Sequence, residues 1–353
     1  MRKQDKVKWF NQFNQGRDSI RRTKMHKRIH FFVNPCSEIT LSVQGGYCVI
    51  GNFNLAECAT QQQATDAVKA LTKALIRVNT MPALYQNEVK ISNRIGVGPT
   101  GIHEWIYKKF GGSNLLNVLY GGVGPVVAAC LRELSDAAKE TAFEYSKELG
   151  VNPPETVTMI APTGTVSKLF SVTEGAHPPA YLFYLRWVQF SKDDPKLQEL
   201  IAAGYPAREL KFQADRWIVG FPTETELAKI SGGKNVVCAG ELSVEDHFEW
   251  LRFLEKHWLG PTHANQISYT LKYDPKNVSL DEYRAMMLEH MPTVKCCSIM
   301  QEADTNAYEY LPEEKITREE FDAISAKIKE KKEERVDRAH VDCGTGGCPV
   351  DFK

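Results

Sequence analysis

The chain lacks a net charge, because 44 Lys and Arg side chains are balanced by 44 Asp and Glu side chains. This balance gives no overall reason to expect nucleic acid or another polyanion as a partner. No run approaches the roughly 20 apolar residues that a membrane-spanning helix needs. The basic start of the chain is not followed by the apolar stretch of a secretory signal peptide. We therefore expect a cytoplasmic protein with neither a nucleic-acid nor a membrane partner.

Internal repeats and heptads are also absent from the sequence, which contains nine cysteines. In a cytosolic chain of this length, cysteines are more often thiols than parts of a disulfide scaffold. Each cysteine must therefore be judged by its surroundings. Those without usable spacing to a partner are expected to be structural: Cys58, Cys130, Cys238, Cys296 and Cys297.

Strand-like and helix-like patterns alternate along the chain, which predicts an α/β domain built on parallel strands. Helices are predicted over residues 65–78, 126–149 and 244–258, and near Leu280 and Arg318, where capping boxes stand. Strands are predicted at "ETVTMI", "RWIVGF" and "NQISYTLKY". Glycines and a proline in "RIGVGPTGIHEW" favour a loop or a close approach of two backbones.

Composition divides the chain into three parts. Residues 1–30 form a basic segment, for which a solvated terminus is the simplest interpretation. Residues 31–333 carry the alternating elements, and residues 334–353 follow a charged run and end in the Gly-rich "CGTGGCPV". Glycines on both sides of a threonine predict a flexible tail there.

The stretch "FVNPCSEITL" places an amide, a thiol and a carboxylate at alternate positions, Asn34, Cys36 and Glu38. Pro35 disfavours helical backbone at the residue before it, so we expect an extended segment with all three side chains on one face. A single cysteine is often only a small buried hydrophobe. If Cys36 is reactive, it acts either as a thiolate nucleophile or as a thiyl radical, and the residues alone do not choose between the two.

A second candidate is the turn after the predicted strand "ETVTMI". Backbone N–H groups and hydroxyls of such a turn can hold an anion such as phosphate. The Gly-Lys-Ser/Thr signature of a Walker loop is missing, and an ordinary hydroxyl-rich turn is the alternative. The residues predicted to bind phosphate are Pro162, Thr163, Gly164, Thr165, Val166 and Ser167.

Three further cysteines are candidates for redox chemistry. Four residues separate Cys343 from Cys348, and two glycines stand directly before Cys348, so the two cysteines can close a disulfide without backbone strain. Zinc would need more ligands than this tail offers, so no metal site is predicted. Cys48 lies in a strand-like run, and burial in a core strand is its alternative interpretation.

Taken together and in this order, the segments resemble the catalytic subunit of ribonucleotide reductases. The likeness rests on "NPCSEI", "RIGVGPTGIHEW", "APTGTVSKLFSVTEGAHPP", "NQISYTLKYDP" and "CGTGGCPV". It is strongest to the monomeric type that depends on adenosylcobalamin and reduces ribonucleoside triphosphates. Tyr308 and Tyr310 are not adjacent, unlike the tyrosine pair of the oxygen-dependent type, and no glycyl-radical loop is visible.

The resemblance implies the second half of a ten-stranded α/β barrel, with a central finger loop and a flexible redox-active tail. The first half of the barrel, with one cysteine of the substrate-reducing pair, has no counterpart in this sequence. We therefore expect a C-terminal fragment or one piece of a split enzyme, with the N-terminal half as a partner. An inactive remnant that binds a nucleotide or a partner protein is the alternative.

The resemblance also implies a role for each candidate. Cys36 becomes the thiyl radical, Glu38 takes the proton of the 3′-hydroxyl and Asn34 holds the sugar hydroxyls. Cys48 supplies reducing equivalents together with a cysteine of the missing half.

Cys343 and Cys348 would reduce the resulting disulfide and be restored by a thioredoxin-like reductant. Adenosylcobalamin is the implied cofactor and a ribonucleoside triphosphate the implied substrate. A free dithiol oxidoreductase that uses only the tail cysteines is a third interpretation; the tail lacks the helix start that lowers the pKa of redox cysteines.

Overall fold

The computed structural model describes residues 31–42, 46–82, 86–295, 297–301 and 308–329. The chain divides into a larger unit, within Met1–Phe183 and Glu224–Thr305, and a smaller unit, within Tyr184–Thr223 and Asn306–Lys353. The sequence did not reveal this division. The domain borders predicted at residues 30 and 333 lie outside the described residues and stay predictions.

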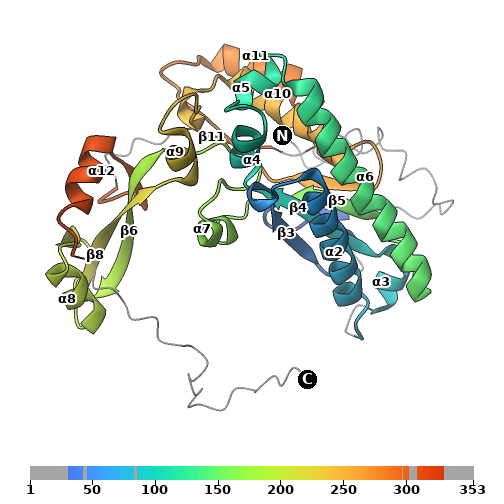
Figure 1. Cartoon of the computed structure of the whole chain (residues 1–353), viewed down its shortest axis with the longest axis horizontal. Coiled ribbons are helices and arrows are strands. Elements are labelled where there is room, and N and C mark those ends of the chain that lie inside the picture. The colour runs from blue at the N-terminus through green and yellow to red at the C-terminus, as the bar shows by residue number, and fades with distance from the viewer. Residues whose placement is uncertain (1–30, 43–45, 83–85, 296, 302–307, 330–353) are drawn as a thin grey trace. The chain divides into compact units, whose positions relative to one another are not determined.

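A four-stranded parallel sheet in the order β3-β4-β5-β9 forms the centre of the larger unit. Its strands are β3 (Ile50–Asn54), β4 (Arg94–Thr100), β5 (Thr156–Ile160) and β9 (Ala264–Ile267). Helices α2 (Gln61–Asn79) and α6 (Gly124–Leu149) pack on each other and on one face of this sheet (Figure 1). Parallel neighbours need such crossover helices. The predicted parallel α/β arrangement is confirmed.

The remaining elements of the larger unit fill the connections. They are β1 (Phe31–Val33), β2 (Thr40–Ser42), η2 (Leu55–Glu57), α3 (Gln86–Ser92), α4 (Ile102–Lys109), α5 (Leu115–Leu119), α7 (Val166–Phe170), α9 (Glu226–Ser231), η3 (Ala239–Glu241), α10 (Val244–Leu254), η4 (Glu255–Leu259), β10 (Thr270–Tyr273), α11 (Leu280–His290) and β11 (Ser298–Gln301). The predicted helix end at Gly150 is confirmed, since this C-cap glycine has a φ of 66°.

The glycine-rich "RIGVGPT" is a fully buried strand, β4, and not a loop. The alternative prediction of a close approach of two backbones is confirmed at Gly98, where a Cβ would lie 2.7 Å from the carbonyl oxygen of Met159. The alternation along β4 separates two faces: Ile95 and Val97 enter the main core, while Gly96 and Gly98 face the other side. A Cβ at Gly96 would lie 2.6 Å from the Cδ1 of Ile39. The glycines therefore make room for the segment around Ile39, and we call this side the hairpin face of the sheet.

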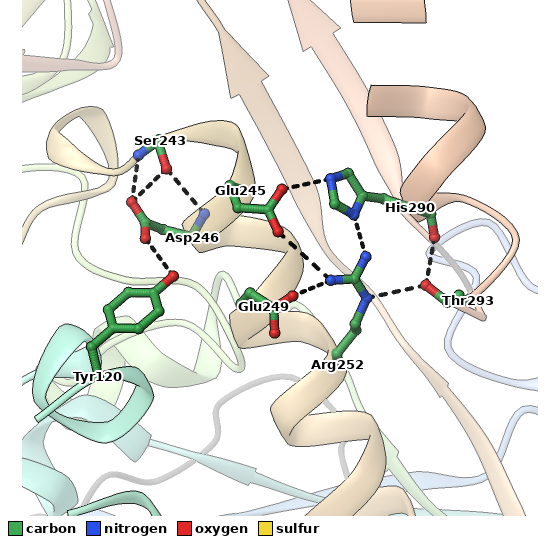
Figure 2. A network of polar contacts seen from close by, with 8 residues as sticks. All are labelled: Tyr120, Ser243, Glu245, Asp246, Glu249, Arg252, His290 and Thr293. Atoms are coloured by element: carbon green, nitrogen blue, oxygen red, sulfur yellow. Dashed lines mark hydrogen bonds and ion pairs between the residues drawn. The ribbon is translucent and has the colours of Figure 1, made fainter. Parts of the chain in front are cut away.

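A polar network joins α10 to α11 in the larger unit (Figure 2). Arg252 forms ion pairs with Glu245 and Glu249, and also bonds to His290 Nδ1 and to Thr293 Oγ1. The Nε2 of His290 lies 2.6 Å from the second oxygen of Glu245. Since Nδ1 accepts from the guanidinium, the proton of the neutral imidazole is at Nε2. One guanidinium thus ties two helices together.

The smaller unit contains an antiparallel sheet in the order β12-β6-β8-β7. The elements of this unit are β6 (Phe183–Ser191), α8 (Pro195–Ala202), β7 (Ala207–Glu209), β8 (Arg216–Glu224), β12 (Glu313–Lys315) and α12 (Arg318–Ser325). The strand predicted at "RWIVGF" belongs to this sheet and not to the parallel one.

No helix of the described residues is long and apolar enough to cross a membrane.

Candidate active site

The segment around Cys36 is the tip of an antiparallel hairpin formed by β1 and β2. The predicted extended backbone is wrong here. Ser37 adopts a left-handed φ of 64°, and its N–H donates to the carbonyl of Asn34 at 2.9 Å. The tip is therefore a tight turn, in which Cys36 is exposed while Glu38 is only 1% exposed. Alternation along a strand does not account for how the three side chains approach one another.

Asn34 organises this turn and links it to Cys48. Its Oδ1 accepts a hydrogen bond from the N–H of Ile39 at 3.0 Å, and its Nδ2 lies 3.4 Å from the Sγ of Cys48. Cys48 stands just before β3, in an exposed position, so it is not buried in a core strand. The structure thus brings together residues fourteen positions apart in sequence.

Electrostatic coupling ties Glu38 to both thiols. Partial burial raises the pKa of the Cys36 thiol above its ordinary value, and the nearby Glu38 carboxylate raises it further. The same two causes, in the same order, raise the pKa of Cys48 to about 11. Cys48 is exposed as a residue, but its sulfur lies against Asn34 and is partly removed from water. Both cysteines are therefore protonated thiols near pH 7.

Glu38 also has an unsatisfied atom. Its Oε2 is buried and has no hydrogen-bond partner among the described residues. A buried carboxylate oxygen without a partner is costly, so such atoms are common where a ligand completes the site. The tip of the hairpin therefore offers a proton acceptor, a thiol and an amide in one place.

The predicted phosphate-binding turn, residues 162–167, follows β5 directly, and Thr163 has a left-handed φ of 53°. Two of its hydroxyls are used within the protein. Thr163 Oγ1 lies 3.1 Å from Thr100 Oγ1, and Ser167 Oγ donates to the Thr163 carbonyl at 2.7 Å. Thr165 and Gly164 are exposed. N–H groups at the start of α7, at Val166 and just before it, have no intrahelical partner by the geometry of a helix start.

Two of the sequence segments that carry the resemblance meet behind this turn. Glu104 accepts hydrogen bonds from the N–H of Thr173 at 2.9 Å and from its Oγ1 at 2.6 Å. Burial raises the pKa of Glu104, although these two bonds oppose the shift. The Ala176 carbonyl accepts from Trp250 Nε1 at 2.8 Å and lies 3.4 Å from His103 Nε2. "GIHEW" and "TEGAHPP" thus form one buried support for the turn.

The segment "NQISYTLKY" joins the same support, and it forms two strands, β9 and β10. His177 stacks on Tyr269 with ring centroids 4.7 Å apart and accepts from the N–H of Thr270 at 3.0 Å. The hydroxyl of Tyr269 is 2.6 Å from His247 Nδ1. Burial lowers the pKa of both histidines. These contacts fix the turn relative to β9 and α10.

Cys343 and Cys348 lie outside the described residues, so their predicted redox role stays a prediction. The sequence did not single out Gln266 in β9, whose backbone and side chain both donate to carbonyl groups of the hairpin tip. The only sequence signal for Gln266 was its position within the predicted strand "NQISYTLKY".

Known proteins that are similar to this chain belong to the family that the motifs indicated. The adenosylcobalamin-dependent ribonucleoside-triphosphate reductase of Lactobacillus gasseri is 26% identical over 90% of this chain and 45% of its own length. The enzyme of the same name from Euglena gracilis is 25% identical over 84% of this chain and 38% of its own length. The chain is similar to part of these reductases. The resemblance predicted from the sequence is confirmed.

The fold agrees with that similarity. The crystal structure of a B12-dependent class II ribonucleotide reductase matches with a TM-score of 0.73, at 22% identity, over 86% of this chain and 43% of that one. The α/β fold of ribonucleotide reductases is thereby confirmed. The chain spans less than half the length of the curated reductases it matches. No family model matches it.

Proposed function

We propose that this chain is the catalytic C-terminal part of an adenosylcobalamin-dependent ribonucleoside-triphosphate reductase and works together with an N-terminal part. The observation that carries the proposal is the cluster of Asn34, Cys36, Glu38 and Cys48 at the hairpin tip. The similarity to the Lactobacillus gasseri and Euglena gracilis reductases along most of the chain supports it.

The protonation of the thiols favours radical chemistry over nucleophilic chemistry. A nucleophilic cysteine needs a lowered pKa, which a nearby cation or a helix start supplies. Cys36 has the opposite setting, because burial and the Glu38 carboxylate raise its pKa. An S–H bond, and not a thiolate, is what gives up a hydrogen atom. The surroundings of Cys36 therefore suit a thiyl radical.

Each residue then has a defined role in the proposed reaction. The sulfur radical of Cys36 takes the hydrogen atom from C3′ of the ribose, and Glu38 accepts the proton of the 3′-hydroxyl through its unpartnered Oε2. A thiol of the reducing pair protonates the 2′-hydroxyl, which leaves as water, and Glu38 later returns its proton to the 3′-oxygen. Cys48 and a cysteine of the N-terminal part give two electrons and two protons and become a disulfide. Cys36 finally returns the hydrogen atom to C3′.

The proposed cofactor fits the position of Cys36, which is an exposed residue at the hairpin tip. Adenosylcobalamin supplies, when bound, the homolysis that yields a radical able to take the thiol hydrogen. The residue of this chain that faces this chemistry is Cys36, and Asn34 keeps the turn in place while the hydrogen atom leaves.

The turn at residues 162–167 is the proposed phosphate site. Because Thr163 and Ser167 use their hydroxyls internally, backbone N–H groups of Gly164, Thr165 and Val166 are the expected donors. The exposed hydroxyl of Thr165 adds a further donor. The tail cysteines Cys343 and Cys348 would reduce the active-site disulfide by thiol exchange and would themselves be reduced by a thioredoxin-like protein.

Reconstitution tests the proposal. The chain is mixed with the N-terminal part of a related reductase, a ribonucleoside triphosphate, adenosylcobalamin and dithiothreitol, and deoxyribonucleotide is measured. We expect product only in the mixture, loss of product with Cys36→Ala, and full product with Cys238→Ser, a cysteine outside the hairpin tip. A complex that forms but makes no product would support the inactive remnant instead.

A further inference from the structure

One residue of β9 holds both carbonyl groups that flank the centre of the hairpin tip. The backbone N–H of Gln266 donates to the carbonyl of Glu38 at 3.0 Å. Its side-chain Nε2 donates to the carbonyl of Ser37 at 2.9 Å. Gln266 is only 5% exposed, and its bond to the Ser37 carbonyl is partly buried. The backbone between Cys36 and Glu38 is therefore fixed from outside the hairpin.

These two bonds act where the backbone is least favourable. Ser37 has a left-handed φ, which costs free energy in a residue other than glycine. The orientation of the peptide between Ser37 and Glu38 sets the direction in which the side chains on either side leave the turn. A donor on the Ser37 carbonyl keeps this peptide in one orientation. It thereby keeps the Glu38 carboxylate near the two thiols.

The anchor is itself rigid, because β9 is tied into the parallel sheet on its other side. Asn265 Nδ2 donates to the Ile95 carbonyl at 2.8 Å, and the side chain of Ile267 is fully buried in the main core. The N–H of Ser268 donates to the carbonyl of Ile160 at 2.9 Å. Alternation along the strand thus points Gln266 toward the hairpin tip and its two neighbours into the sheet.

We infer that Gln266 is the positioning residue of the active site, the group that holds the Cys36–Glu38 turn in its reactive geometry. This inference rests on the proposed function for its catalytic part and on the two hydrogen bonds for its structural part. Gln266 touches no reacting atom; it acts through the backbone of Ser37 and Glu38. The role accounts for the glutamine in "NQIS", to which the proposed chemistry assigned nothing.

The variant Gln266→Met tests the inference, since methionine has a similar length but no N–H donor. Gln62→Met is the matched control, because Gln62 is exposed on α2 and bonds only to Asp66 among the described residues. Amide hydrogen exchange of the full chain is measured at Ser37 and Ile39. Loss of one hydrogen bond predicts exchange about three- to tenfold faster in Gln266→Met and unchanged in Gln62→Met.

Kinetics of the reconstituted mixture test the catalytic part. We expect kcat to fall by about tenfold or more in Gln266→Met, with KM for the nucleotide within about twofold, because misplaced groups slow the reaction without weakening binding. Unchanged exchange at Ser37 and Ile39 would overturn the anchor, and faster exchange with an unchanged kcat would overturn its role in catalysis. If the unmodified mixture makes no product, the proposed function fails, and the exchange rates alone still decide whether Gln266 is the anchor.

Discussion

Replacing Glu38 by glutamine should make Cys48 more reactive. The pKa of Cys48 stands about two units above its usual value near 9, with burial as the larger cause and the Glu38 carboxylate as the second. Removing the negative charge should therefore lower the pKa by about one unit, or about 1.4 kcal/mol of electrostatic free energy. At pH 8 the thiolate is a small fraction in either protein, so this fraction should rise by up to about tenfold.

Alkylation measures the thiolate fraction directly. The full chain and its Glu38→Gln variant are treated with iodoacetamide across pH 7 to 10, and mass spectrometry reports the rate at the peptide that carries Cys48. Cys238, which stands at the start of η3 and not in the hairpin tip, serves as the internal control. An equal or slower rate at Cys48 in the variant would refute the electrostatic coupling of Glu38 to this thiol.

Three further predictions concern stability. Arg252→Met should lower the free energy of unfolding by about 1–3 kcal/mol, because its partners in α10 and α11 lose a charged donor. In the same denaturation series, the control variant Arg284→Met, at an exposed arginine, should lower it by less than about 0.5 kcal/mol. Equal losses in the two variants would contradict a stabilising role of the Arg252 network. Gly98→Ala should lower the free energy of unfolding by about 1–3 kcal/mol, since its Cβ would lie 2.7 Å from a backbone carbonyl oxygen. Gly240→Ala is the control, because a Cβ at Gly240 would meet open space. A Gly98→Ala variant as stable as the unmodified chain would contradict the close packing. Burial lowers the pKa of His103 to about 4, so the stability this neutral histidine contributes is complete above its unfolded pKa of about 6.5 and is lost as the pH falls toward 4. Denaturation at pH 7 and pH 4 should therefore show that the unmodified chain loses about 3 kcal/mol more than His103→Gln, and parallel losses would refute this.

The sequence predicted the parallel sheet and the long helices because their apolar periods are local properties. At β4 it left open whether Gly96 and Gly98 mark a loop or a close approach of two backbones, and it did not predict the strand. Glycine is needed at these two positions because Ile39 and Met159, which lie far away in the sequence, occupy the space that a Cβ would fill. Spacing within a segment carries no information on such a contact. The smaller unit was missed for a similar reason. Its strands come from two stretches that lie far apart in the sequence, and no change in composition marks where either stretch begins.

The candidate residues of the site could be predicted by type but not by geometry. The alternation of Asn34, Cys36 and Glu38 suggested an extended strand, whereas the left-handed Ser37 makes a turn. The approach of Cys48 to Asn34 follows from the hairpin packing on the sheet. The hydroxyls of the phosphate turn were expected to be free, and the folded chain uses two of them internally. Side-chain partners of this kind depend on tertiary contacts.

Electron paramagnetic resonance can show whether Cys36 carries the radical. The chain is produced with cysteine deuterated at Cβ and mixed with the N-terminal part of a related reductase, adenosylcobalamin and a ribonucleoside triphosphate, and the sample is frozen during turnover. We expect a radical signal that narrows on cysteine deuteration and disappears in Cys36→Ala. A signal whose width does not change on deuteration, or one that persists in Cys36→Ala, would contradict a radical at Cys36. The absence of any radical signal in the mixture would contradict it as well.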